Sequence, residues 1–284
     1  MLQKVLKYDL RAIFKYWWIL AVSSFGASII GGIGLNLFIN AVNSTKDINP
    51  FLIIFAFLAM ILGFLAISAF VIGNEIFILI RYYRNFFTDE GYLTFTLPVS
   101  RTHLLNSKII SAFIANFATV SLATIEVFMM FFITDLRTDI IDGLKGLNEL
   151  FNWPQFFPDK NITAIGIGFA VSGIIIFLAI VVLALCSTLL EFCCITIAGT
   201  VTKKNKVLVA IGIYYGVSMV ISFISRIGTL MAMTIPDIIV TQTPVIATLT
   251  ILFLALVVLC ILCIVAISIY TLVSHILHKK LNLS

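Results

Sequence analysis

Six long apolar runs alternate with short charged segments along the chain. Each run is long enough to cross a bilayer, since a transmembrane helix needs about 20 consecutive apolar residues, and each holds at most one charged residue. The pattern predicts an all-α membrane protein with six transmembrane helices in a single domain, residues 1–284. Residues 161–202 exceed one span, so they form either one long helix or a helix with an interfacial segment. The predicted spans lie within residues 17–42, 51–78, 109–134, 161–202, 207–236 and 238–278.

Composition excludes the soluble classes of protein. The chain is 61% hydrophobic and 11% charged, whereas soluble domains are about 45–50% apolar and about 25% charged. It lacks the GxxxxGKS/T phosphate loop and the HExxH and GxSxG motifs of hydrolases. We therefore expect no enzymatic activity, no cofactor and no metal site on this chain. All five cysteines fall in apolar runs, where they are expected to be packing residues.

The distribution of positive charge predicts the orientation. With both termini on one side of the membrane, 13 of the 18 Lys and Arg residues fall on that side, 4 fall on the opposite side and Arg226 lies within a span. Because Lys and Arg are retained on the cytoplasmic side, both termini are predicted to be cytoplasmic. The net charge of +5 then reflects the anionic inner leaflet, and no nucleic-acid partner is expected.

The first 16 residues carry two stripes at helical spacing. Leu6, Leu10 and Ile13 belong to an apolar stripe, and four basic residues recur on another face. The two stripes predict an amphipathic helix, residues 1–16, that lies on the inner surface of the bilayer. The alternative is a basic orientation signal with no further role. The basic residues are Lys4, Lys7, Arg11 and Lys15.

The predicted cytoplasmic loop between the second and third spans, residues 81–103, carries apolar side chains next to acidic ones. Apolar side chains in an aqueous loop need a cover, which is either the membrane domain itself or a groove on another protein. Ser100 is a good N-cap for the helix that follows. The residues concerned are Asp89, Glu90, Tyr92, Leu93 and Phe95.

The run FTDEGYLTFTLPVSR at residues 87–101, followed by LLNSK at residues 104–108, resembles the cytoplasmic loop of type-2 ABC transporter permeases from Gram-positive bacteria. The six-span layout, the cytoplasmic termini and the amphipathic N-terminal helix also fit that family. The resemblance implies a bacterial plasma-membrane protein that binds a separate ABC ATPase subunit, which carries the ATP and Mg²⁺. It also implies a dimer with a second permease, identical or sister. The residues that would form the coupling helix in a cleft of the ATPase are Asp89, Glu90, Tyr92, Leu93 and Phe95.

Two spans contain small residues four apart, a spacing that allows close approach of helices in lipid. In the first span, Gly31 follows Ala27 by four residues and Gly32 follows Ser28 by four. In the fifth span, Gly216 follows Gly212 by four residues. These glycines pack either within one chain or between two chains. The resemblance implies that both helices line a permease dimer, with a cargo path that Asn36 faces.

Glu126 and Arg226 are charged residues inside the predicted third and fifth spans. Both lie at a similar depth, because Glu126 follows Lys108 by 18 residues and Arg226 follows Lys206 by 20 residues. This matched depth predicts an intramembrane ion pair. Alternatively, Arg226 reaches the outer headgroups.

The longest segment on the outer side, residues 135–162, combines apolar residues at helical spacing with an aromatic cluster around Trp153. It predicts a short amphipathic helix on the outer surface followed by an aromatic anchor. The alternative is a lid over an exit.

These features together predict the membrane subunit of an ATP-driven exporter. The expected cargo is amphipathic or hydrophobic, such as an antimicrobial peptide, a drug or a lipid-like molecule. One alternative is a stand-alone channel or secondary transporter, which should show broken helices or charged residues at the midplane. Another is a membrane scaffold without transport.

Overall fold

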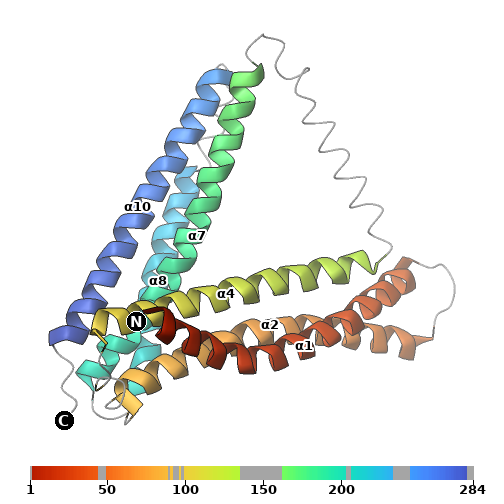
Figure 1. The fold of residues 1–284 in the computed structure, drawn as a ribbon. Coiled ribbons are helices and arrows are strands. Elements are labelled where there is room, and N and C mark those ends of the chain that lie inside the picture. Colours follow the sequence, from red (N-terminus) through yellow and green to blue (C-terminus); the bar gives the residue numbers. More distant parts are fainter. Residues whose placement is uncertain are drawn as a thin grey trace. The chain divides into compact units, whose positions relative to one another are not determined.

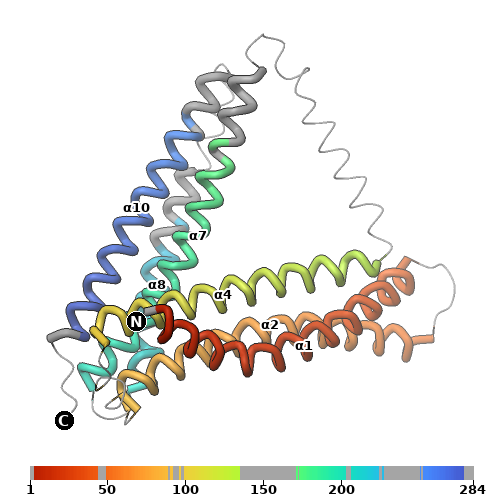
Figure 2. The backbone as a smooth tube through the Cα atoms, in the orientation of Figure 1, coloured from red at the N-terminus to blue at the C-terminus, as the bar shows by residue number. Residues whose placement is uncertain are grey.

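The computed structural model describes residues 2–43, 49–88, 90–91, 96, 99–134, 162–202, 206–232 and 244–279 (Figures 1 and 2). Six helices in these ranges are long and apolar enough to cross a membrane, and the same ranges contain no strand. The predicted six-helix, all-α class is therefore confirmed. The helices are α1 (Leu2–Asn43), α2 (Pro50–Phe87), α4 (Arg101–Phe132), α7 (Ile162–Val201), α8 (Lys206–Ala232) and α10 (Pro244–Lys279).

Local sequence signals begin two of the helices. Asn49 precedes Pro50 at the start of α2 and accepts a hydrogen bond from the backbone N–H of Phe51 at 3.1 Å. Proline is favoured at the first helical position because its missing N–H has no intrahelical partner there. Ser100 precedes α4, and its Oγ accepts from the backbone N–H of His103 at 3.4 Å. Ser100 therefore occupies the predicted N-cap position.

Several helices are longer than a bilayer requires. The 42 residues of α1 correspond to about 63 Å at a rise of about 1.5 Å per residue, against a hydrocarbon core of about 30 Å. α2 continues to Phe87, and α4 begins at Arg101, so the connection between them is shorter than the predicted loop 81–103. The reason is that Tyr82 and Phe86 continue the helical spacing and are buried. Residues 162–201 form one long helix, which selects the first of the two readings of that run.

Residues 2–16, predicted as a separate amphipathic helix, are the first turns of α1, which continues into the span without a break. Ile13 and Trp17 are buried, whereas Lys4, Lys7 and Arg11 are exposed. Leu6 and Leu10 of the apolar stripe are half-buried, and the amphipathic character of this segment stays a prediction. The position of this segment at the membrane surface, and the cytoplasmic placement of both termini, stay predictions.

The chain divides into two compact units, each described here by itself. Unit 1 comprises Met1–Arg81 with Asn106–Phe151, and unit 2 comprises Tyr82–Leu105 with Asn152–Ser284. In unit 1, α1, α2 and α4 share an apolar core. One cluster joins Trp17, Ala21 and Phe70. The other joins Ile67, Ala123 and Met130.

Glycines let α1 approach both of its neighbours in unit 1. A Cβ atom built on Gly31 would lie 2.7 Å from the Cα of Gly63 on α2. A Cβ atom built on Gly32 would lie 3.2 Å from the Cα of Met130 on α4. Real Cβ atoms essentially never come within 3.0 Å of another heavy atom, so the position of Gly31 needs glycine. At Gly32 a Cβ atom would be accommodated only if α4 gave way by a few tenths of an ångström. Gly31 and Gly32 thus take part in packing within one chain, the first of the two alternatives for this stripe.

Unit 2 is built around α7, which packs against both α8 and α10. The end of α2 belongs to this unit, and its Tyr82 ring stacks on Phe192 of α7 with centroids 4.0 Å apart and planes 5° apart. α8 leaves many large apolar side chains exposed, including Tyr215, Met219 and Phe223. Exposed apolar side chains on a membrane helix suit contact with lipid or with another membrane protein.

Candidate functional site

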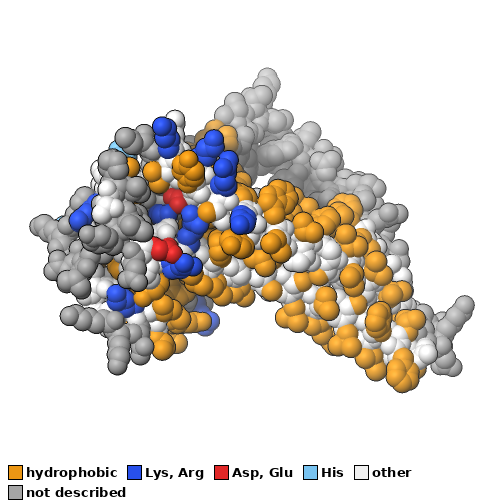
Figure 3. All heavy atoms as spheres, turned by 60° about the horizontal axis from the view of Figure 1, so that its bottom comes forward, with side chains coloured by type: hydrophobic (Ala, Val, Ile, Leu, Met, Phe, Trp, Pro, Cys, Tyr) orange, Lys and Arg blue, Asp and Glu red, His pale blue; other side chains and the backbone are white. Residues whose placement is uncertain are grey.

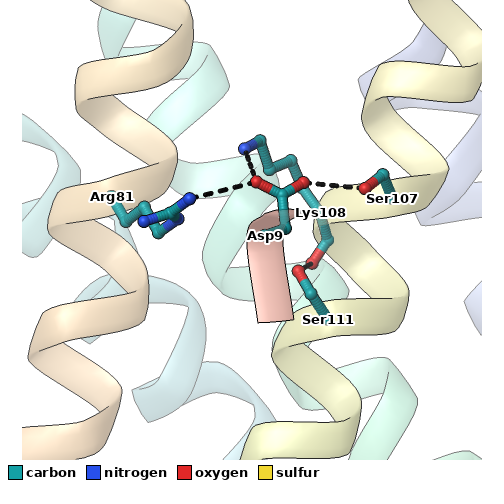
Figure 4. Close-up of polar contacts among 5 residues, drawn as sticks. All are labelled: Asp9, Arg81, Ser107, Lys108 and Ser111. Carbon is teal, nitrogen blue, oxygen red and sulfur yellow. Dashed lines mark hydrogen bonds and ion pairs between the residues drawn. The ribbon is translucent and has the colours of Figure 1, made fainter. Parts of the chain in front are cut away.

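In the described part of unit 1, several polar side chains converge on Asp9 of α1. Its Oδ1 accepts from Lys108 Nζ on α4 at 2.5 Å and from Arg81 Nη2 on α2 at 3.2 Å. Its Oδ2 accepts from Ser107 Oγ on α4 at 2.7 Å. These four residues, Asp9, Arg81, Ser107 and Lys108, are called the Asp9 cluster, and Figure 4 shows how they converge from three helices.

The Asp9 cluster is largely withdrawn from solvent. Exposed fractions of the side chains are 6% for Asp9, 9% for Lys108 and 26% for Arg81. One carboxylate faces two cations, so the cluster carries one excess positive charge. Buried charges need close partners because desolvation costs several kcal/mol per ion. Asp9 therefore supplies a close counter-charge to the buried Lys108.

Asp9 was not among the residues predicted from the sequence, because the basic residues around it dominate the polar side of this helix. One signal was present: Asp9 is the only acidic residue among the first 46. An isolated acid on the apolar side of a basic helix predicts a buried partner cation. Which cation it pairs with depends on contacts 72 and 99 residues away along the chain.

The Asp9 cluster joins the two helices that flank the predicted cytoplasmic loop. Arg81 lies on α2 six residues before its end at Phe87, and Lys108 lies on α4 seven residues after its start at Arg101. Asp9 therefore links both stems of the loop to α1. Figure 3 shows Lys and Arg side chains gathered with acidic side chains at one end of the visible surface, while much of the remaining described surface is hydrophobic.

The segment that contains the loop is also anchored inside unit 2. Thr196 Oγ1 lies 2.8 Å from Tyr82 Oη and 2.6 Å from the carbonyl oxygen of Phe192. Because the single hydroxyl hydrogen of Thr196 goes to that carbonyl, Tyr82 is the donor to Thr196. On the other side of the loop, Arg101 Nη1 donates to the carbonyl oxygen of Leu277 on α10 at 3.0 Å. α7 and α10 each hold one flank of the loop.

The structure describes only part of the predicted coupling helix. Glu90 is exposed and forms an ion pair with Arg84 in the last turn of α2. Gly91 is buried and its backbone N–H donates to the carbonyl oxygen of Thr88 at 2.8 Å, which supports a turn at the start of the loop. The predicted residues Asp89, Tyr92, Leu93 and Phe95 lie outside the described residues, as does the outer segment from 135 to 161.

Three polar contacts connect the helices of unit 1 farther along the bundle. Trp17 Nε1 donates to Thr119 Oγ1 at 2.8 Å, and Asn74 Nδ2 donates to Asn116 Oδ1 at 2.8 Å. Ser24 Oγ lies 2.7 Å from Oε1 of Glu126. These contacts link α1 to α4 and α2 to α4.

The remaining predicted site residues are divided between unit 1 and unit 2. Asn36, half-buried on α1, accepts from Asn40 Nδ2 at 3.4 Å. For Gly212 and Gly216 on α8, no atom of the described residues lies within 4 Å of an added Cβ, so this part of α8 leaves space beside it within the described chain. Arg226 is exposed on α8 in unit 2, and Glu126 belongs to unit 1. Their ion pair stays a prediction.

Within the described ranges, no group of three or more His, Cys, Asp or Glu side chains is placed to hold a metal ion. The five cysteines are free thiols, and three of them lie in α7. The features of the described residues that bear on function are therefore their charges, their packing and the connections between helices. A comparison of the chain with protein-family models, curated proteins and solved structures found no match.

Proposed function

We propose that this chain is the membrane subunit of an ATP-driven exporter in a bacterial plasma membrane, with the ATPase on a separate subunit. The supporting observation is the anchoring of the predicted cytoplasmic loop. Its stems are tied to α1 by the Asp9 cluster, and its flanks are tied to α7 and α10 by Tyr82 and Arg101. A force applied to this loop therefore acts on helices of both units.

Movement of the loop is then coupled to the bundle by short-range contacts. Asp9 accepts from Lys108 and Arg81 together, so α2 and α4 cannot separate at this level without breaking an ion pair. The stack of Tyr82 on Phe192 resists sliding of the end of α2 along α7. Buried contacts of this kind transmit a displacement of the loop to the helices, because closely packed side chains shift between a few defined arrangements and do not deform continuously.

The proposal extends to two protein partners. The loop residues Asp89, Glu90, Tyr92, Leu93 and Phe95 seat in a cleft of the ATPase, where the acidic and aromatic side chains find a cover. A second permease, identical or sister, packs against the open α8 face at Gly212 and Gly216. The cargo is amphipathic or hydrophobic, as the resemblance of residues 87–108 to type-2 ABC transporter permeases implies.

Co-purification and ATPase measurement test this function. The full chain is expressed together with any phosphate-loop ATPase that the neighbouring reading frames encode, and ATP hydrolysis is measured in lipid vesicles. We expect the chain to change the hydrolysis rate of the bound ATPase. Asp9→Asn should reduce this effect several-fold while the complex still assembles, whereas Arg11→Gln, an exposed neighbour on the same helix, should leave it unchanged. Leu93→Asp should weaken assembly itself.

Two results would refute the proposal. If no ATPase co-purifies and the chain alone moves solutes across vesicles without nucleotide, the chain is a channel or secondary transporter. If the chain binds an ATPase but neither Leu93→Asp nor Asp9→Asn alters assembly or hydrolysis, the loop is not the coupling element.

A further inference from the structure

We propose that Glu126 is a proton-binding site: it is held as a neutral carboxylic acid between α1 and α4, and the proton is its ligand. This inference is independent of the ATPase and of the cargo. It rests on the burial of Glu126, on the hydrogen count at its one polar contact, and on the charged residues of the three helices of unit 1.

Glu126 is fully buried, with 0% of its surface exposed. Ala123 and Met130, which lie about one turn to either side of it on α4, form an apolar cluster with Ile67 of α2. The carboxyl group therefore lies in an apolar interior. An isolated ionised carboxylate is very costly in such surroundings, and a buried carboxyl group without a cation becomes neutral instead.

Along the described lengths of α1, α2 and α4, no Lys or Arg lies close to this carboxyl group in the sequence. On α1, the nearest titratable residues to Ser24 are Tyr16 and Lys15, and the latter lies nine residues away, or about 13 Å along the helix. On α2, the nearest to Ile67 is Glu75, about 12 Å away and itself an acid. On α4, Lys108 lies 18 residues before Glu126, or about 27 Å.

The hydrogen atoms around Ser24 point to a protonated acid. Ser24 Oγ lies 3.0 Å from the carbonyl oxygen of Ala21 and 2.7 Å from Oε1 of Glu126, but a serine hydroxyl has only one hydrogen to donate. If Glu126 carries the proton on this oxygen, Glu126 donates to Ser24 and Ser24 donates to Ala21. Both contacts are then hydrogen bonds. If Glu126 is ionised, one of the two contacts has no hydrogen.

A metal ion fits this place less well than a proton. Mg²⁺ and Ca²⁺ take six or more oxygen ligands, whereas the contacts around Glu126 supply its own two oxygens and the hydroxyl of Ser24. The second carboxyl oxygen, Oε2, has no hydrogen-bond partner among the described residues. The carbonyl oxygen of a neutral carboxylic acid can remain without a hydrogen bond at a lower cost in free energy than an oxygen of an ionised carboxylate. A movement that separates α1 from α4 would admit water and release the proton.

Infrared spectroscopy of the full chain in lipid nanodiscs at neutral pH tests the proposal. We expect a C=O stretching band of a neutral carboxylic acid that disappears in Glu126→Gln and remains in Glu90→Gln, whose carboxylate is exposed and paired with Arg84. If the wild-type spectrum and the Glu126→Gln spectrum do not differ in this band, Glu126 is ionised and the proposal is wrong.

A second measurement does not require a Glu126 variant to fold. A lipid-soluble carbodiimide reacts with neutral carboxylic acids in apolar surroundings, and mass spectrometry locates the modified residue. We expect modification of Glu126 in the wild type and to the same extent in Arg226→Gln. Modification that appears only in Arg226→Gln would establish the ion pair with Arg226 instead, and no modification in either protein would also overturn the proposal.

Discussion

Asp9→Asn is the substitution that most directly tests the role of the Asp9 cluster. The wild-type cluster has one anion and two cations, and the amide removes the carboxylate that both Lys108 and Arg81 contact. At an effective dielectric constant of about 20, unit charges about 3 Å apart attract by about 5–6 kcal/mol before desolvation is counted. Loss of one partner from a buried ion pair costs about 3–5 kcal/mol of unfolding free energy. We expect a loss of that size.

The charge balance of the Asp9 cluster predicts that replacing Lys108 costs less unfolding free energy than replacing Asp9. Lys108→Met leaves Asp9 paired with Arg81, so the cluster becomes neutral and loses one charge-assisted hydrogen bond, worth about 1–3 kcal/mol. The double variant Asp9→Asn with Lys108→Met keeps Arg81 as the one charged residue of the Asp9 cluster, and Arg81 is 26% exposed and can reach water. We therefore expect the double variant to be more stable than the sum of the single effects predicts, by about 1–3 kcal/mol.

Equilibrium unfolding of the full chain in mixed detergent micelles measures these free energies. Arg11→Gln is the matched control, because Arg11 is exposed on the same helix, and its effect should lie within about 0.5 kcal/mol. Two results would refute the reasoning. One is a loss for Asp9→Asn no larger than that of the control. The other is a loss for Lys108→Met equal to or above that of Asp9→Asn.

Two further predictions concern packing. Gly63→Val should destabilise the chain by about 1–3 kcal/mol more than Gly212→Val, because a Cβ at Gly63 meets the Cα of Gly31 at 2.7 Å whereas nothing lies within 4 Å of one at Gly212; equal melting temperatures in detergent would contradict this. Tyr82→Phe should cost about 1 kcal/mol through loss of its hydrogen bond to Thr196, and Tyr82→Ala should cost about 3–5 kcal/mol because the ring stack is also lost. If thermal unfolding finds these two variants equally stable, the stack on α7 contributes nothing.

For Gly31 and Gly32 of α1, the sequence predicted close helix packing but not the helices that pack there. The spacing of small residues on α1 indicates that some helix approaches closely, because small residues four apart lie on one face. The identity of the neighbours does not follow from this spacing. The structure selects Gly63 of α2 for Gly31 and Met130 of α4 for Gly32, since the partner depends on how three helices pack together. The glycines of α8, Gly212 and Gly216, meet no atom within 4 Å of an added Cβ among the residues that the structure describes.

The sequence by itself determined that this chain is an all-α membrane protein with six long helices, because the length and apolar content of each run can be read residue by residue against the thickness of a bilayer. It also located the N-cap of α4 and the small-residue faces. Only the tertiary structure decided that Asp9 pairs with Lys108 and Arg81, and that Glu126 lies against Ser24. These partners are 72 to 102 residues apart in the chain, and the free energy of a buried polar contact depends on which side chains meet, not on the pattern of either helix alone.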